Sequence, residues 1–263
     1  SKSIGVSNKS DYSDGNEVSF KSGAMIAVLS LLNSCDFNNE NIIVRRCQPW
    51  IVDAETTFQP VIADPIISMY QSPMGLEFIG MFPDPPKRPA APDYLGDYDL
   101  KLLSALSNHS SYRDGFRQTM GTILRNRKLF LDIIYEHKRQ TISRVILKPT
   151  QFYWSFIQQL SKHLYLDPKT FKEKVRFFFG LTRSHGISRI IREQEIKYLE
   201  RLAIPVFHSR IDTGSIIEAP SISILSGGYS VVERRIRLLS DEKSSSMLKD
   251  LDKLVLHSSI VFS

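Results

Sequence analysis

The sequence has very few cysteines and no long apolar run. Only two of its 263 residues are cysteines, Cys35 and Cys47, which excludes a secreted protein built on disulfides and is typical of a reducing compartment. The longest apolar run, residues 24–32, is shorter than the about 20 residues that a membrane-spanning helix needs. No charged and then apolar leader opens the chain, so we expect a cytoplasmic protein without a membrane span.

Several motifs of well-known sites are also missing. The six histidines are scattered without metal-ligand spacing, and we expect each to be a surface or helix-end residue. With two cysteines and no stretch rich in cysteine and histidine, no zinc site is expected. Gly227-Gly228 predicts a turn rather than a phosphate loop, because no Gly-Lys-Ser/Thr follows, and no G-x-S-x-G nucleophile motif occurs.

The composition favours a globular protein with an acidic partner. Hydrophobic residues make up 42% of the chain, which is enough for one large core or two small ones. The formal net charge is +6 and the pI is about 9.2. ATP, an acidic peptide and nucleic acid are all negatively charged partners that a basic protein attracts.

The most informative stretch combines an apolar run with acidic and amide side chains. Residues 20–32 predict a buried helix that ends just before Asp36; Asn41 follows five residues later, and Asp53 twelve after that. The Asn41 amide and the Asp53 carboxylate are hard oxygen ligands of the kind Mg²⁺ takes beside ATP. Asp36 is placed to orient and deprotonate an attacking hydroxyl. This spacing is typical of kinase-like phosphotransferases.

Two short strands are predicted within this stretch. Residues 42–44 and 50–52 are apolar and rich in β-branched side chains, and residues 45–49 between them predict a turn. Such a hairpin brings Asn41 and Asp53 face to face. The alternative is a polar turn that ends a helix and has no further role.

Three blocks of the chain resemble, in the same order, the kinase-like dehydratase region of class II lanthipeptide synthetases. The first has D-F-N-N-E-N at 36–41 and P-W-I-V-D-A-E-T at 49–56, similar to D-x-H-x-E-N and P-hydrophobic-hydrophobic-D-x-E-T. The second, R-V-I-L-K-P-T-Q-F-Y at 144–153, is similar to R-x3-R-x-T-x2-Y, with Lys148 in place of the second Arg. The third, E-I-K-Y-L-E-R-L-A-I-P-V-F at 195–207, is similar to E-x3-L-x3-(D/A)-I-P-x-F.

The resemblance implies a two-step reaction on a ribosomally made precursor peptide. Ser or Thr hydroxyls are phosphorylated by ATP, and the phosphate is then eliminated to leave a dehydro residue. Asp36 is implied as the catalytic-loop acid, Asn41 and Asp53 as the Mg²⁺ and ATP site, and Arg144 and Thr150 as elimination residues. A guanidinium holds a phosphate bidentately and a hydroxyl completes its hydrogen bonds. The sequence pattern alone also fits a structural alternative, in which Arg144 is a surface charge at a strand start and Thr150 is a helix N-cap.

Asn38 departs from the family, which has His at this position. An Asn side chain holds a hydrogen bond but does not exchange a proton near neutral pH, whereas His does. Activity is therefore expected to be reduced or altered if the His transfers a proton, and to be retained if it only orients the loop.

The predicted fold is α+β, a kinase-like C-lobe followed by a mostly helical region. Residues 1–16 are expected to be disordered or a linker, 17–100 the kinase-like part with a Pro-rich connection, and 101–263 the mainly helical elimination and support region. Helices are predicted over 112–137, 152–164, 168–179, 187–202 and 231–239, and an extended segment over 216–225. Nothing before Asp36 supplies a phosphate-gripping Lys, so we expect a separate N-lobe, or a cyclase portion, as partner.

Two other function classes compete with this interpretation. A basic stripe suits a nucleic-acid backbone, although Asp114, Asp132 and Glu136 interrupt it as on a solvated helix face. The stripe consists of Arg113, Arg117, Arg125, Arg127, Lys128, Lys138, Arg139 and Arg144. A non-catalytic peptide-binding scaffold is the third class, but a scaffold has no need of Asp36, Asn41 and Asp53 together.

Overall fold

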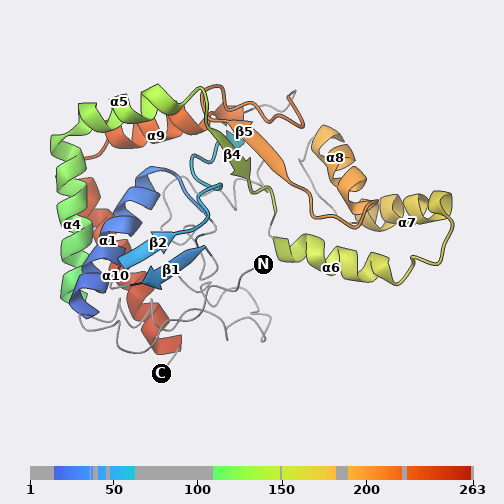
Figure 1. The fold of residues 1–263 in the computed structure, drawn as a ribbon, viewed down its shortest axis with the longest axis horizontal. Helices are drawn as coiled ribbons and strands as arrows, with labels where there is room; N and C mark the ends of the chain where they lie inside the picture. Colours follow the sequence, from blue (N-terminus) through green and yellow to red (C-terminus); the bar gives the residue numbers. More distant parts are fainter. Residues whose placement is uncertain are drawn as a thin grey trace. The chain divides into compact units, whose positions relative to one another are not determined.

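The computed structural model describes residues 15–35, 37, 41–45, 48–62, 109–148, 150–181, 189–220 and 224–261 (Figure 1). Within these ranges helices alternate with short strands that form three two-stranded antiparallel sheets. The predicted α+β class is thereby confirmed. None of the described helices has the length and apolar character needed to cross a membrane.

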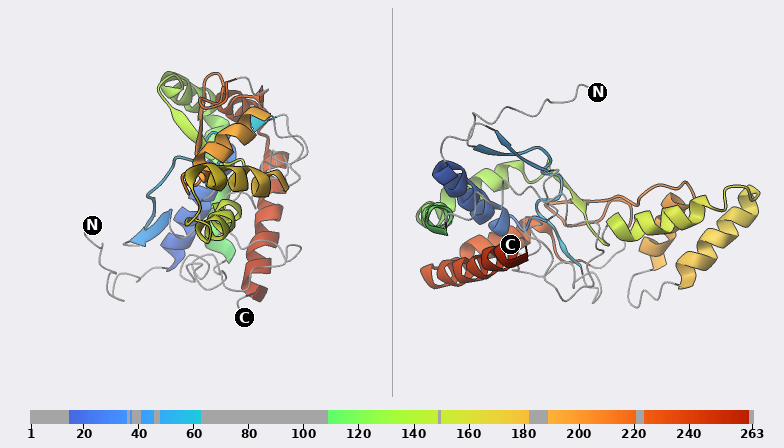
Figure 2. Two further views of the ribbon diagram at one scale, coloured as in Figure 1. Left: turned by 90° about the vertical axis from the view of Figure 1, so that its right-hand side faces the viewer. Right: turned by 90° about the horizontal axis from the view of Figure 1, so that it is seen from below.

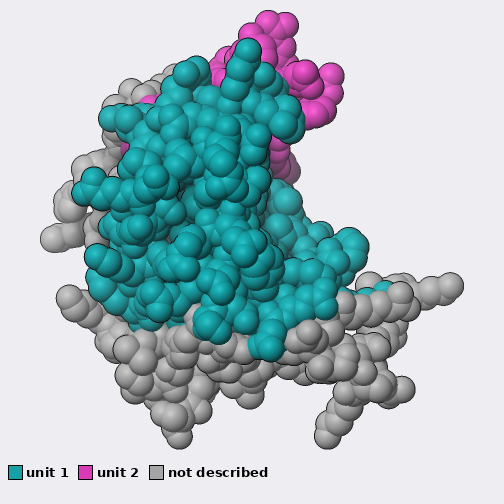
Figure 3. All heavy atoms as spheres, turned by 90° about the vertical axis from the view of Figure 1, so that its left-hand side faces the viewer, with its two compact units in different colours: residues 1–57, 74–134, 232–263 teal, residues 58–73, 135–231 magenta. Residues whose placement is uncertain are grey.

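The chain divides into two compact units, each assembled from separate parts of the sequence (Figure 3). Unit 1 contains residues 1–57, 74–134 and 232–263, and unit 2 contains residues 58–73 and 135–231. The predicted division into segments 1–16, 17–100 and 101–263 stays a prediction, because residues 1–14 and 63–108 lie outside the described part of the chain.

Unit 1 is built on a close crossing of two helices. Its elements are α1 (Gly15–Leu31), the hairpin β1 (Ile42–Arg45) and β2 (Gln48–Ile51), α4 (His109–Arg125), most of α5 (Arg127–His137), the end of α9 (Gly228–Arg237), and α10 (Asp241–Val261). A Cβ atom on Gly23 of α1 would lie 1.9 Å from the carbonyl oxygen of Tyr112, and one on Gly115 of α4 would lie 1.9 Å from that of Phe20. The two helix backbones therefore touch at glycines.

The core of unit 1 surrounds this crossing. Helix α10 lies beside α1 and α4 (Figures 1 and 2) and contributes Leu248, Leu251 and Val255 to a cluster with buried side chains of both. The Tyr112 hydroxyl donates a 2.7 Å hydrogen bond to Asp252 of α10. Burial of the Tyr112 phenol, together with this bond, raises its pKa. The helix predicted for residues 20–32 is confirmed as α1.

The single helix predicted over 112–137 is wrong at one position, because α4 and α5 are separated at Asn126. The Asn126 amide donates to the carbonyl oxygen of Thr122 at 2.9 Å, and such side-chain bonds compete with a regular helix. Arg127 then donates to the carbonyl oxygens of Arg237 and Leu239, which holds the start of α5.

Unit 2 combines two small sheets with a group of three helices. Strand β3 (Val61–Ile62) pairs with β6 (Ile224–Ser226), and β4 (Ile142–Val145) pairs with β5 (Phe207–Arg210). Helices α6 (Thr150–Ser161), α7 (Pro168–Leu181) and α8 (Arg189–Leu199) share a buried cluster (Figure 2). Asp167 caps α7 by accepting the N–H groups of Lys169 and Thr170.

Most predicted elements of unit 2 are confirmed. Helices α6, α7 and α8 overlap the predicted ranges 152–164, 168–179 and 187–202, and α9 overlaps the prediction for 231–239 but starts three residues earlier. The extended segment predicted over 216–225 is only partly found: Ile216 forms an isolated bridge with Ser209, and β6 starts at Ile224. Gly228 begins α9, and a Cβ atom there would lie 2.0 Å from the carbonyl oxygen of Phe58.

Candidate functional site

The predicted hairpin is confirmed, and it places two candidate ligands at its open end. Strands β1 and β2 pair with Ile42 opposite Ile51. One step further, the N–H of Val52 donates to the carbonyl oxygen of Asn41 at 3.0 Å. Asn41 and Asp53 therefore leave the two strands at the same end. The strands extend to Arg45 and Gln48, so the turn is shorter than the predicted 45–49.

Asp53 begins a tight turn. Its Oδ1 accepts the N–H of Glu55 at 3.0 Å, and the N–H and hydroxyl of Thr57 both donate to the carbonyl oxygen of Ala54. Asp53 itself is exposed and Asn41 is half-buried. A carboxylate fixed by its own turn and left open to solvent is suited to a cation that keeps water and phosphate ligands.

A second contact ties the start of the Asp36 loop to this turn. The N–H of Cys35 donates to the carbonyl oxygen of Thr56 at 3.2 Å, and the Thr56 hydroxyl donates back to the carbonyl oxygen of Cys35. Phe37 is fully buried in the unit 1 core. Asp36 and Asn38 lie outside the described residues, but the neighbours of Asp36 on both sides are anchored.

The donor set fits Mg²⁺ better than a metal that needs a closed site. Among the described residues no group of three or more His, Cys, Asp or Glu side chains gathers to hold a metal. One amide and one carboxylate oxygen at an open hairpin end suit Mg²⁺, which commonly takes few protein ligands and completes its shell with water and phosphate. Both residues thus fit the Mg·ATP role predicted for them.

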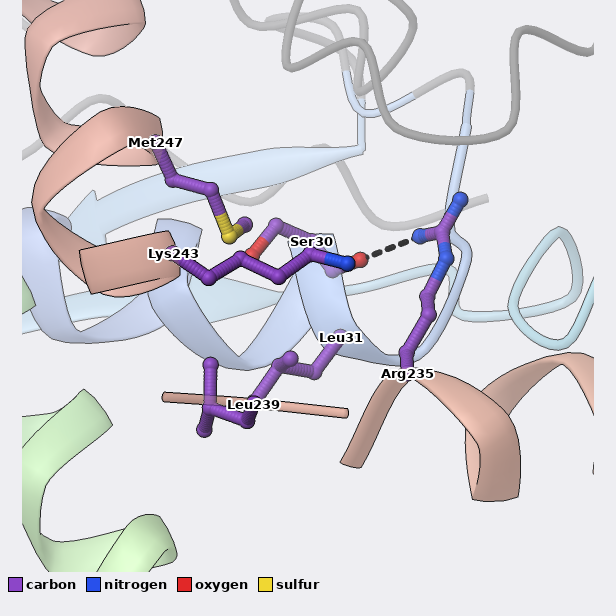
Figure 4. Close-up of a pocket in the computed structure, with 6 residues that line it drawn as sticks. All are labelled: Ser30, Leu31, Arg235, Leu239, Lys243 and Met247. Carbon is purple, nitrogen blue, oxygen red and sulfur yellow. Dashed lines mark hydrogen bonds between the residues drawn. The ribbon is translucent and has the colours of Figure 1, made fainter. Parts of the chain in front are cut away.

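The end of α1, which leads to the Asp36 loop, is held by a half-buried arginine. Arg235 of α9 donates to the carbonyl oxygen of Ser30, one of the last carbonyls of α1 (Figure 4). These terminal carbonyls have no partner within a helix. Burial lowers the pKa of Arg235 to about 10. The pocket beside this contact is lined by Ser30, Leu31, Arg235, Leu239, Lys243 and Met247. Sequence reasoning did not single out Arg235.

The two predicted elimination residues lie in unit 2, on either side of the short connection from β4 to α6. Arg144 is the third residue of β4 and is half-buried, and Thr150 is the exposed first residue of α6. Thr150 thus stands at a helix start, as its structural alternative also predicts. Arg144 lies inside the strand, paired with His208 of β5.

A buried ion pair fixes the connection between them. Lys148 Nζ lies 2.5 Å from Glu195 Oε1, and the Tyr153 hydroxyl donates to the same oxygen at 2.6 Å. The Glu195 side chain is 0% exposed and that of Lys148 is 9% exposed. Burial, followed by the Glu195 charge and hydrogen bond, raises the pKa of Tyr153. Lys148 also lies over the rings of Phe152, Tyr153 and Phe179.

Sequence reasoning did not name Lys148, Tyr153 or Glu195 as site residues. All three residues stand in the second and third family-like blocks. A sign that Glu195 is buried was available in the sequence, because this charged residue lies on one helix face with the apolar residues Ile191 and Leu199. Charged side chains are almost never fully buried without a partner.

With these contacts established, the sequence was compared with known families and proteins. The sequence profile of a domain family of unknown function, DUF4135, matches residues 9–81 and 99–210. The chain belongs to the DUF4135 family. A search of curated proteins found no match.

The DUF4135 match covers both clusters described above. It includes the Asn41–Asp53 hairpin of unit 1 and the Arg144–Thr150 connection of unit 2, together with Glu195. The gap in the match, residues 82–98, falls in the Pro-rich connection. Helices α9 and α10 follow the matched part of the sequence.

Proposed function

We propose that this DUF4135 chain carries the catalytic core of a class II lanthipeptide synthetase-like dehydratase, with a kinase-like C-lobe. The observation that carries the proposal is the hairpin, which brings Asn41 and Asp53 to one end while Thr56 holds the residue before Asp36. The resemblance of the three sequence blocks supplies the reaction: phosphorylation of Ser or Thr in a precursor peptide, then elimination of phosphate.

In the phosphorylation half, residues of unit 1 bind and orient the reactants. The Asn41 amide oxygen and the Asp53 carboxylate would hold Mg²⁺, and the metal would supply charge neutralisation for the phosphates of ATP. Asp36 orients the substrate hydroxyl and takes its proton. We assign no proton transfer to Asn38, because its amide does not titrate. A kinase-like site also requires a phosphate-binding lysine, which we assign to a partner N-lobe.

In the elimination half, residues of unit 2 act on the phosphorylated peptide. The Arg144 guanidinium holds the leaving phosphate, and the Thr150 hydroxyl donates a further hydrogen bond to it. Lys148 and Glu195 position both residues, because their ion pair fixes the short connection from β4 to α6.

The contacts of the basic stripe argue against the nucleic-acid alternative. Arg113 lies 3.5 Å from Asp252, and Arg117 lies 3.3 Å from Asp114. Lys138 lies over the rings of Tyr135 and Tyr229, at 3.9 and 4.4 Å from their centroids. These cations are already engaged within the chain, which weakens a continuous phosphate-binding surface.

The test is the mass of the product peptide when the chain acts with its N-lobe and ATP. Asp53→Asn should leave the peptide unmodified, whereas Arg144→Ala and Thr150→Ala should leave it carrying phosphate, because the leaving group is stabilised only after transfer. Asp132→Asn, an exposed acid on α5, is the matched control and should behave as wild type. Identical products from all variants would contradict the proposal, and tight duplex binding that falls steeply with salt would favour nucleic acid instead.

A further inference from the structure

The sheet β4–β5 has one buried face and one outer face. The strand pattern alternates, and the outer positions are Ile142, Arg144, His208 and Arg210. Strands β4 and β5 lie side by side (Figure 1). Arg144 lies directly opposite His208 in the antiparallel register, so their Cβ atoms are neighbours at about 5 Å on the same face. Arg210 is the diagonal neighbour of Arg144 and adds a second guanidinium to this face.

Glu218 holds the His208 ring in one orientation. Its Oε1 lies 2.7 Å from His208 Nδ1, and its Oε2 accepts the His208 backbone N–H at 2.8 Å. The N–H of Ile217 donates to the carbonyl oxygen of His208, which keeps the Glu218 segment against β5. A carboxylate at Nδ1 favours the proton on that nitrogen and leaves Nε2 as a proton acceptor.

The ring is also accessible. The His208 side chain is 40% exposed, whereas Glu218 is 20% exposed. A peptide that placed its phosphate on Arg144 would therefore meet the His208 ring on the same open face of the sheet. His208 is a surface residue, as the sequence predicted for the histidines, but its ring is held in one orientation in a strand rather than at a helix end.

We infer that His208 is the base of the elimination step and that Glu218 is its positioning residue; this inference rests on the proposed function. Nε2 of His208 takes the hydrogen on Cα of the phosphorylated residue as a proton. The electron pair of that C–H bond forms the Cα=Cβ double bond. The Cβ–O bond breaks and its electron pair leaves with the phosphate, which Arg144 holds. The proton then passes from His208 to solvent, so no oxidant or reductant is required.

The elimination step can be tested without ATP, using the full chain and a synthetic phosphoserine peptide of the precursor. Released phosphate and the mass of the dehydrated peptide are measured. His208→Ala should slow release by about 100-fold or more, the range expected for loss of a general base. Added imidazole should restore part of the activity of His208→Ala and none of that of Arg144→Ala. Glu218→Gln should cause a smaller loss, and His137→Ala, an exposed histidine on α5, should behave as wild type.

The outcomes separate the inference from the proposed function. If His208→Ala released phosphate at the wild-type rate while Arg144→Ala did not, His208 would not be the base and the proposed function would stand. If the wild-type chain released no phosphate, the proposed function would fall and the base assignment with it. A loss of activity in His208→Ala without imidazole rescue would also overturn the base assignment.

A binding measurement tests the shared face without turnover. Inorganic phosphate is titrated into the chain while the histidine ring signals are followed by NMR. The His208 signals should move with phosphate, and this shift should be lost in Arg144→Ala, whereas the His137 signals should stay in place. Unmoved His208 signals would contradict a common phosphate face. Thermal unfolding of each variant shows whether it is folded.

Discussion

At the scale of single residues, the buried ion pair Lys148–Glu195 has a large effect on stability. Two charges removed from water gain little net stability when paired, but one of them left alone is strongly unfavourable. The pair joins residues 47 positions apart in the sequence. It therefore fixes the loop next to Thr150 through a contact that local structure does not provide.

Lys148→Met should lower the free energy of unfolding by about 3–5 kcal/mol, because it leaves the Glu195 carboxylate buried without its partner. Urea unfolding at neutral pH measures this change. Lys148→Arg keeps the charge and restores the residue that the resembling family carries, so it should lose much less. The matched control is Lys162→Met, at an exposed lysine after α6. Equal stability of Lys148→Met and wild type would show that the pair does not hold the fold.

At this scale the sequence predicted proximity within a hairpin better than contacts between distant residues. Asn41 and Asp53 were predicted because both belong to one short hairpin, where spacing alone determines proximity. The Lys148–Glu195 and His208–Glu218 contacts were not predicted. The first contact joins elements that are distant in the sequence. The second depends on the path of residues 211–218 after β5, which the sequence pattern of these residues does not predict. Long-range pairing depends on tertiary packing, which a local pattern does not contain.

At the scale of elements, the crossing of α1 and α4 depends on two glycines. Gly23→Ala should lower the free energy of unfolding by about 1–3 kcal/mol or more, because the new Cβ meets the backbone of Tyr112 and the helices must separate. Thermal or urea unfolding reports the change.

Gly121, in the partner helix α4, provides the control. A Cβ atom there has only the end of the Arg125 side chain within 3.3 Å, and that side chain can move. Gly121→Ala should therefore stabilise α4 by up to about 1 kcal/mol, since Ala is the better helix former. If both substitutions had the same sign, close approach of the helices would not explain Gly23.

Periodicity predicted these elements well and their ends less well. The apolar spacing of α6, α7 and α8 follows the helical repeat, and each was placed correctly. The break at Asn126 was missed because the apolar stripe continues across it, while a side-chain bond to Thr122 interrupts the helix. Over the described residues 216–220, turns and an isolated bridge stand where a strand was predicted, and β6 starts at Ile224.

At the scale of the whole molecule, unit 1 depends on a segment far beyond its candidate site residues Asn41 and Asp53. Helix α10 supplies Leu248, Leu251 and Val255 to the core that also contains α1 and α4. A chain that ends at Ser240 should lose hydrogen-exchange protection in α1, because this helix then lacks part of its buried surface. The α6–α8 cluster of unit 2 should keep its protection. Retained protection in α1 would show that α10 is dispensable for unit 1.

The discontinuous make-up of unit 1 also determines the order in which the chain can mature during synthesis. Every residue of unit 2 is synthesised before residues 232–263 are made. The Tyr112–Asp252 bond, which spans 140 positions, can form only after Asp252 has been added to the chain. Contacts of such high separation form slowly and leave apolar surface exposed in the meantime. The nascent chain is therefore most dependent on chaperones after α1 has been synthesised and before α10 is available to pack against it.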